Sequence, residues 1–171
     1  AQVLGIALDQ VRIIPSAVGG GFGGKLDCSV QPLLAVAAWI LEKPIRCTFT
    51  RPESLASSTK RHPAKMKASA SCDKDGTLTS LSFEGDFNTG AYASWGPTVA
   101  DRVPIHCSGP YFVPNILAKT RALLTNGPPS GAFRGFGVPQ SAIAHEALMD
   151  SLAEQTGIDP LEFRLKNTLR K

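Results

Sequence analysis

Five glycines and one phenylalanine, followed by a lysine, occupy residues Gly19 to Lys25. An apolar, strand-like run from Val11 to Val18 leads into this segment, and a helix-like segment leads out of it. Glycines allow positive φ and close approach of a backbone to a ligand, and N–H groups at the start of a helix attract electron-rich groups. We interpret the segment as a ligand-binding turn, with a tight structural connection as the alternative.

One phosphate-binding pattern fits this segment incompletely. Gly19, Gly24 and Lys25 have the spacing of the phosphate loop of nucleotide hydrolases. In that loop a Ser or Thr follows the Lys and ligates magnesium, but here Leu26 follows. The nucleotide-hydrolase interpretation therefore lacks its metal ligand.

A dinucleotide-binding pattern fits better, although not fully. Gly19, Gly21 and Gly24 match the fingerprint of Rossmann domains, in which an acidic residue at the end of the next strand binds the ribose. The expected strand, Ile45 to Thr50, is followed by Arg51 instead. An Arg there could bind a ribose phosphate, so a Rossmann-like dinucleotide-binding module remains an alternative.

A second glycine-rich segment runs from Ala132 to Gly137 and again contains aromatic residues. It also precedes an expected helix, from Pro139 to Gln155. Its side chains admit two interpretations each: Phe133 and Phe136 as core residues or ligand contacts, and Arg134 as a solvated charge or a site residue.

Two isolated residues in other segments are also candidates. Arg102 is by default a surface residue unless the fold places it in a cleft. His62 is a more plausible structural histidine than a metal ligand, since no partner stands at ligand spacing. No Cys or His spacing typical of zinc occurs, and we expect no metal ligands among the side chains.

The elements that must position these residues follow from periodicity and turn signals. Met66 to Phe87 alternates in hydrophobicity around an Asp73 to Gly76 turn, which predicts a β-hairpin. The other expected elements are helices over Ser29–Glu42, after Arg51, near Thr98–His106 and after Asp159, and a strand over Ile116–Leu124. We predict an α+β fold with a mixed sheet, a β-hairpin and packed helices. The hairpin disfavours the all-parallel sheet of a Rossmann domain.

The composition is that of an ordinary globular chain. The 171 residues are 43% hydrophobic and 19% charged, so residues 1–171 are expected to form one domain or a fragment of one. The net charge of +4 is small and scattered, which argues against nucleic-acid binding. No apolar run approaches a membrane span of about 20 residues.

The chain ends and the cysteines give further expectations. The sequence begins without a methionine in an apolar stretch, so we expect a fragment or part of a split polypeptide. The four cysteines lie far apart and are typical of small buried side chains in a reducing compartment. We expect a cytoplasmic protein with no membrane partner.

Three motifs in order resemble the molybdenum-binding subunit of the xanthine dehydrogenase and aldehyde oxidase family. They are Gly19 to Lys25, Lys60 to Pro63, and Ala132 to Gln140, and the similarity continues through the ending Gly157 to Asn167. The family's subunit is several times longer, so the chain resembles its middle part. The resemblance implies part of a molybdenum hydroxylase that oxidises a heteroaromatic, purine-like substrate or an aldehyde with oxygen derived from water.

The resemblance also assigns roles to individual residues. Both turns would contact a molybdopterin cofactor, largely through backbone groups, and should therefore lie close together in space. The cofactor-binding residues would be Gly21, Phe22, Gly23, Ala132, Phe133 and Arg134. Phe136 resembles the aromatic residue that stacks on the substrate, and Arg102 resembles the arginine that faces it.

One position departs from the family pattern. Purine hydroxylases have a substrate-binding Glu where this chain has Leu26, which places an apolar wall beside the substrate and disfavours xanthine. The general-base Glu of the family lies beyond Lys171, so no catalytic residue is expected in this chain. FAD and 2Fe-2S centres are expected in partner domains or subunits, and the isolated chain is expected to be inactive.

Overall fold

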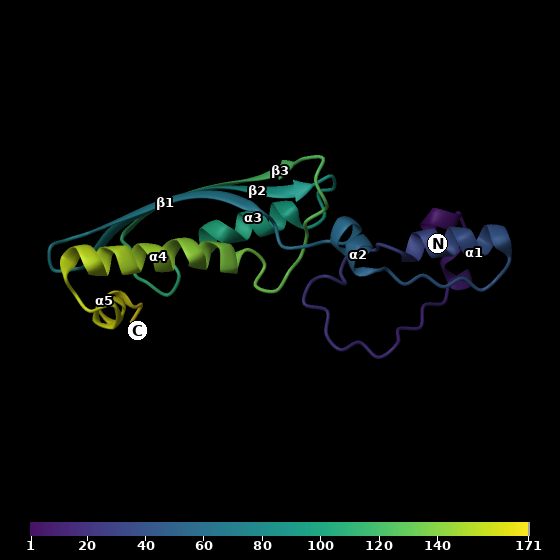
Figure 1. Ribbon diagram of the computed structural model, residues 1–171, viewed down its shortest axis with the longest axis horizontal. Coiled ribbons are helices and arrows are strands. Elements are labelled where there is room, and N and C mark those ends of the chain that lie inside the picture. Colours follow the sequence, from purple (N-terminus) through teal and green to yellow (C-terminus); the bar gives the residue numbers. More distant parts are fainter. Residues whose placement is uncertain (171) are drawn as a thin grey trace.

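The computed structural model describes residues 1–170. It consists of a layered body at one end and an extended arm at the other (Figure 1). The body contains three strands, β1 (Ala64–Cys72), β2 (Leu78–Gly90) and β3 (Asn115–Leu124). Three helices complete the body: α3 (Gly96–Ile105), α4 (Val138–Thr156) and α5 (Pro160–Asn167).

The sheet has the order β1-β2-β3 and is mixed. β1 and β2 form the expected antiparallel hairpin, in which Ala68 lies opposite Phe83. β3 then lies parallel to β2, and α3 is the connection between them. The α+β prediction with a mixed sheet is therefore confirmed.

One face of the sheet carries the core. α4 packs against β1 and α3 packs against β3 (Figure 1). On β2 the buried side chains alternate, as expected for a strand with one covered face. Phe83, Phe87, Val103, Met149 and Phe163 are at most 1% exposed and form the centre of the core.

The helices of the body begin and end where local signals predict. Pro104 in the last turn of α3 cannot donate to the Ala100 carbonyl, which accepts a 2.8 Å hydrogen bond from Thr120 Oγ1 instead. Gly157 ends α4 in a left-handed conformation. The Asp159 side chain accepts hydrogen bonds from the backbone N–H groups of Leu161 and Glu162 and so caps α5.

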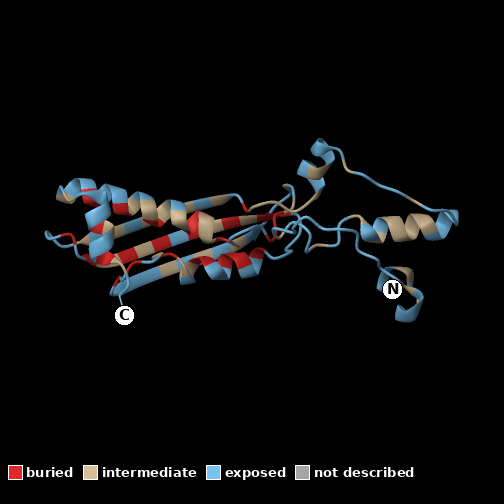
Figure 2. Ribbon diagram, turned by 90° about the horizontal axis from the view of Figure 1, so that it is seen from below, coloured by how far each residue is buried: buried red, intermediate tan, exposed pale blue. Residues whose placement is uncertain are grey.

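Residues 1–58 form the arm, which contains α1 (Gln31–Leu41), α2 (Arg51–Ser57), and two short 3-10 turns, η1 (Gln2–Leu4) and η2 (Leu8–Gln10). No residue before His62 is buried, whereas the buried positions gather in the body (Figure 2). Both helices were expected, over Ser29–Glu42 and after Arg51, and the first begins two residues later than expected, with Val30 as its N-cap.

Two strands expected in the arm do not form. Residues 11–18 and 45–50 are irregular, because neither stretch has a neighbouring strand to pair with. Ile13 and Ile14 in the first stretch are 80% and 72% exposed. The first glycine-rich segment therefore does not follow a strand, and the Rossmann-like alternative is wrong.

The cysteines were expected to be buried, but only some of them are. Cys107 is buried and Cys72 is half-buried, while Cys28 and Cys47 are exposed on the arm. All four are free thiols. No helix in residues 1–170 is long and apolar enough to cross a membrane.

Candidate functional site: two glycine-rich turns that meet

The two glycine-rich turns, far apart in sequence, lie against each other. A Cβ placed on Gly23 would be 2.7 Å from the carbonyl carbon and oxygen of Ala132 and 2.8 Å from the nitrogen of Phe133. Across the same contact, the Arg134 guanidinium lies 5.8 Å from the centre of the Phe22 ring. The expectation that the turns lie close together is confirmed.

Each turn contains a Gly-Phe-Gly sequence whose Phe has an unusual backbone. Phe22 and Phe136 have φ of 49° and 51°, in the left-handed region that costs a non-glycine residue on the order of 1 kcal/mol. Strain of this kind persists where the surrounding structure enforces it, and it is concentrated at functional sites.

The first turn is closed by its own lysine. Lys25 Nζ donates a 2.7 Å hydrogen bond to the Gly20 carbonyl, and the Gly24 N–H donates to the Gly21 carbonyl at 3.0 Å. The N–H groups of Gly21, Phe22 and Gly23 have no acceptor within residues 1–170. The turn thus presents free main-chain donors beside the second turn.

The second turn has a buried donor without a partner. Ala132 is fully buried, yet its N–H donates to no acceptor in the described part of the chain. Unpaired buried N–H groups are rare in native proteins because each forfeits the free energy of a hydrogen bond. In this structure the donor is closed off from solvent, so a ligand would reach it only if neighbouring groups moved.

A hydrogen bond ties the arm to the body beside the turns. The Ser94 hydroxyl donates to both carboxylate oxygens of Asp27, at 2.9 and 2.8 Å. Ser94 precedes Trp95, whose ring lies edge-on to that of Phe136 with 6.1 Å between centroids. Asp27 and Ser94 were not among the expected site residues, since their hydrogen bond depends on the tertiary fold.

Two of the three candidate substrate residues adjoin the turns. Leu26 is 57% exposed and directly follows the first turn, and Phe136 is half-buried in the second. Arg102 is exposed on α3 and makes no hydrogen bond or ion pair with residues 1–170. The neighbouring Val103 packs against Gly137, where a Cβ would be 2.8 Å from Val103 Cγ2. The structure thus places Arg102 on the helix that supports the second turn.

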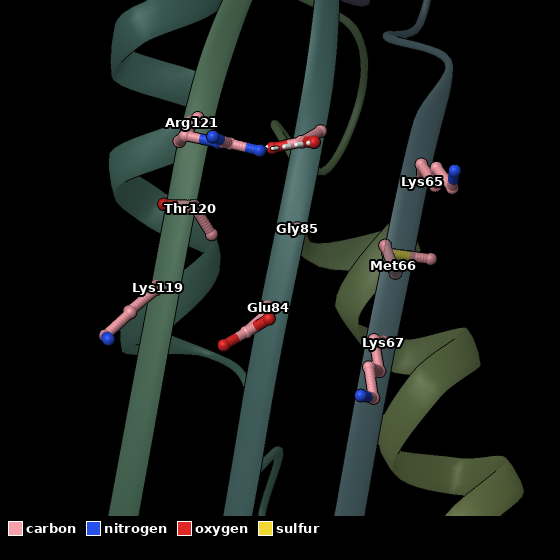
Figure 3. A pocket seen from close by; sticks show the side chains of 9 residues that line it. Lys65, Met66, Lys67, Glu84, Gly85, Lys119, Thr120 and Arg121 are labelled. Carbon is pink, nitrogen blue, oxygen red and sulfur yellow. Dashed lines mark hydrogen bonds and ion pairs between the residues drawn. The ribbon is translucent and has the colours of Figure 1, made fainter.

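A groove on the open face of the sheet is a different feature. The groove is lined by two rows of charged residues that cross the three strands (Figure 3). One row is Lys67, Glu84 and Lys119, and the other is Lys65, Asp86 and Arg121. Arg121 binds Asp86 through two hydrogen bonds of 2.7 and 2.8 Å, which holds the pKa of that carboxyl below its usual range. This face has the alternating charges of a solvated surface and shares no residue with the turns.

The fold thus brings two strained glycine-rich turns together at one end of an α+β body. The chain belongs to the family of molybdopterin cofactor-binding domains, whose model matches residues 1–168. The nicotinate dehydrogenase large molybdopterin subunit of Eubacterium barkeri is 46% identical over 167 residues, which cover 98% of this chain and 39% of that protein. The xanthine dehydrogenase molybdenum-binding subunit of Escherichia coli is 34% identical over 174 residues, covering 99% of this chain and 23% of that protein.

A solved structure gives the same result. The aldehyde oxidoreductase from Desulfovibrio gigas matches with a TM-score of 0.84 and 37% identity, over 89% of this chain and 17% of that one. The chain therefore spans well under half the length of the relatives it matches. The resemblance to molybdenum-binding subunits of the xanthine dehydrogenase and aldehyde oxidase family is confirmed.

The residues present fit a molybdopterin cofactor. Its pterin ring, phosphate and molybdenum oxygens accept hydrogen bonds, and the first turn offers the free N–H groups of Gly21, Phe22 and Gly23. No group of three or more His, Cys, Asp or Glu side chains within residues 1–170 is arranged to ligate a metal. In this domain, the main-chain donors are the groups that suit the cofactor.

Proposed function

We propose that this domain forms part of the active site of a molybdenum hydroxylase that oxidises a flat heteroaromatic substrate, with an aldehyde as the alternative. The observation that carries this proposal is the contact of Gly23 with Ala132 and Phe133, beside the free N–H groups of Gly21 and Phe22. When bound, the molybdenum cofactor supplies two-electron oxidation with oxygen derived from water. Gly21, Phe22 and Gly23 would bind one side of it, and Ala132, Phe133 and Arg134 the other.

Substrate recognition is assigned to the side chains around the turns. Phe136, with its ring held edge-on by Trp95, would pack against the flat ring of the substrate. Arg102 makes no ion pair within residues 1–170, so its guanidinium is available for a carboxylate or for negative charge on a ring oxygen. Leu26 would leave a purine N–H without an acceptor, which costs about 1–3 kcal/mol. A pyridine carboxylate therefore suits this site better than xanthine.

The complete enzyme requires parts outside this chain. The proposal places the general-base Glu, the remaining molybdenum domains, and FAD and 2Fe-2S centres in other domains or subunits. The names of the relatives support a role in a molybdenum-dependent oxidoreductase, because they describe molybdopterin-binding or molybdenum-binding subunits of dehydrogenases and an aldehyde oxidoreductase. We also place the protein in the cytoplasm, which agrees with its four free thiols.

The test compares substrates on the complete complex. We expect kcat/KM to be highest for a pyridine carboxylate, with lower values for xanthine, hypoxanthine and an aldehyde. Arg102→Met should reduce kcat/KM for the anionic substrate by about ten- to hundred-fold, the loss of one charged hydrogen bond. Leu26→Glu should improve purines and weaken the pyridine carboxylate.

A matched control is Arg121→Met, which removes an arginine that is paired with Asp86 on the open face of the sheet. It should leave kcat/KM unchanged for every substrate. If xanthine is the best substrate of the unmodified enzyme, or if Arg102→Met behaves like Arg121→Met, the proposed substrate site is wrong.

A further inference from the structure

Arg61 reaches from the segment before β1 to the second glycine-rich turn. Its Nη2 donates a 2.6 Å hydrogen bond to the carbonyl of Arg134, and its Nη1 donates to Gln140 Oε1 at 3.3 Å. The guanidinium also lies 4.6 Å from the centre of the Phe133 ring. One side chain thus contacts Phe133 and Arg134 in the turn and Gln140 in the helix that follows it.

The backbone on either side of Arg61 is fixed. Lys60 N–H donates to the Pro129 carbonyl at 3.3 Å, and Lys60 O accepts from the Gly131 N–H at 3.0 Å. On the other side, His62 is only 3% exposed, and its carbonyl accepts a 3.2 Å hydrogen bond from Gln140 Nε2. The Arg61 side chain therefore starts from an anchored position directly beside the turn.

The bond to Arg134 falls on the peptide that defines the turn. The Phe136 N–H donates to the Phe133 carbonyl at 2.7 Å, so the central peptide joins Arg134 to Gly135. Gly135 has φ 87°, and positive φ at this position is the mark of a type II turn. Type I and type II turns differ by a flip of the central peptide, and glycine accepts either form.

In a trans peptide the C=O and the N–H groups point in opposite directions. By holding the Arg134 carbonyl, Arg61 also fixes the direction of the Gly135 N–H, which has no acceptor within residues 1–170. A flip would move this donor to the other side of the turn and would shift the following Phe136. The turn has two sterically allowed orientations of this peptide, and Arg61 contacts the one that the structure shows.

We propose that Arg61 is a positioning residue, which selects the orientation of the Arg134–Gly135 peptide and thereby aims the Gly135 N–H at the cofactor and sets the place of Phe136. The cofactor and substrate parts of this inference rest on the proposed function. The selection of the turn state rests on the contacts of Arg61 alone.

The test uses the complete subunit with Arg61→Gln and Arg61→Lys. Arg121→Gln is the matched control, since it removes an arginine with two charged hydrogen bonds on the open face of the sheet. The first measurement is amide hydrogen exchange over residues 131–137 in the cofactor-free subunit. Arg61→Gln should accelerate it about tenfold or more, the loss expected for a charged hydrogen bond. The exchange rate of Arg61→Lys should lie between those of the unmodified subunit and Arg61→Gln, because an ammonium group retains the charge but lacks the planar fork of the guanidinium.

The second measurement is pterin retained per polypeptide after dilution, together with kcat and KM of the loaded complex. Arg61→Gln should lose pterin about tenfold faster and should raise KM more than it lowers kcat, since Phe136 would no longer be held in place. Arg121→Gln should match the unmodified subunit in both measurements.

A double variant tests whether Arg61 acts through the turn state. A Cβ on Gly135 would be 2.6 Å from Pro139 Cδ, and its φ is unfavourable for alanine, so Gly135→Ala also disfavours the observed turn. The double variant should therefore exchange no faster than the faster single variant. Fully additive effects would show that Arg61 acts elsewhere.

The outcomes separate the two proposals. Unchanged exchange over residues 131–137 in both Arg61 variants would overturn the positioning role, whatever the pterin content. An unmodified subunit that holds no pterin, but whose exchange responds to Arg61, would refute the proposed function and retain the turn selection. Should Arg61→Gln fail to fold in thermal melts, the Arg61→Lys exchange rate decides.

Discussion

Substitution of Gly23 by alanine tests the junction of the two turns most directly. The new methyl group would lie 2.7 Å from the carbonyl carbon and oxygen of Ala132, atoms of a peptide that cannot rotate away like a side chain. At 3.4 Å, the start of ordinary van der Waals contact, the turns would stand about 0.7 Å further apart.

The cost has two parts. Gly23 has φ 91°, and alanine in the left-handed region costs about 1–2 kcal/mol. The separation of the turns also moves their N–H groups relative to one another, and a misplacement of about 1 Å can cost a hundred-fold in function. We expect cofactor affinity of the complete subunit to fall on the order of ten- to hundred-fold. The free energy of unfolding should fall by no more than this strain of about 1–2 kcal/mol, because Gly23 lies outside the core and its substitution leaves no core cavity.

Two glycines of the same turn provide matched controls. A Cβ on Gly19 would have no atom within 4 Å, and one on Gly24 would lie 3.9 Å from the nearest atom, the Gly21 carbonyl oxygen. The assay is pterin content after gel filtration of Gly19→Ala, Gly23→Ala and Gly24→Ala subunits. Equal pterin retention by all three would refute the reasoning, as would a loss that is as large in Gly19→Ala as in Gly23→Ala.

Three further predictions concern loading, stability and pH. Residues 1–171 purified alone should contain no stoichiometric molybdenum, because the two turns provide only part of the cofactor contacts; metal analysis with pterin fluorescence checks this, and a full complement would contradict it. Phe87→Ala should lower the free energy of unfolding by about 3–5 kcal/mol in urea titrations, since Phe87 is fully buried, whereas Ile13→Ala, at an 80% exposed position, should change it by less than about 0.5 kcal/mol. Burial lowers the pKa of both His62 and His145, so the unfolded state binds protons first and stability should fall as pH drops below about 6.5. Thermal melts between about pH 7.5 and 5.5 measure this, and a melting temperature that rises on acidification would contradict the assignment.

The elements of the body could be predicted because their signals are local. The β1-β2 hairpin follows from alternation around the Asp73 to Gly76 turn, and α5 follows from the cap at Asp159. The parallel pairing of β3 with β2 depends on how α3 crosses between them, which no local pattern specifies.

The two expected strands that do not form show that a local signal alone is not sufficient. The apolar stretches at residues 11–18 and 45–50 have the composition of strands, but composition does not provide a pairing partner. The sheet of the body ends at β1 and β3, and the arm lies outside it. Their backbone is therefore irregular in this structure.

The candidate site was only partly predictable. The meeting of the two turns was expected from the shared ligand that the resemblance implies. The bond from Ser94 to Asp27 and the grip of Arg61 on Arg134 join residues 67 and 73 positions apart, so the sequence pattern carries no signal for them. The motif from Lys60 to Pro63 includes Arg61 and contributed to the resemblance, but it did not indicate a contact of Arg61 with the second turn.

The arm and the body support the two turns very unequally. The second turn is built on buried Ala132, Gly137 and Gln140, whereas the first belongs to a segment in which no residue is buried. Breaking the Asp27–Ser94 hydrogen bond and the contacts of Gly23 would free the first turn while every core contact persists. Local opening of this kind costs far less than global unfolding. Within residues 1–170, the second turn is therefore held by the core of the body, whereas the place of the first turn depends on a few contacts at its edge.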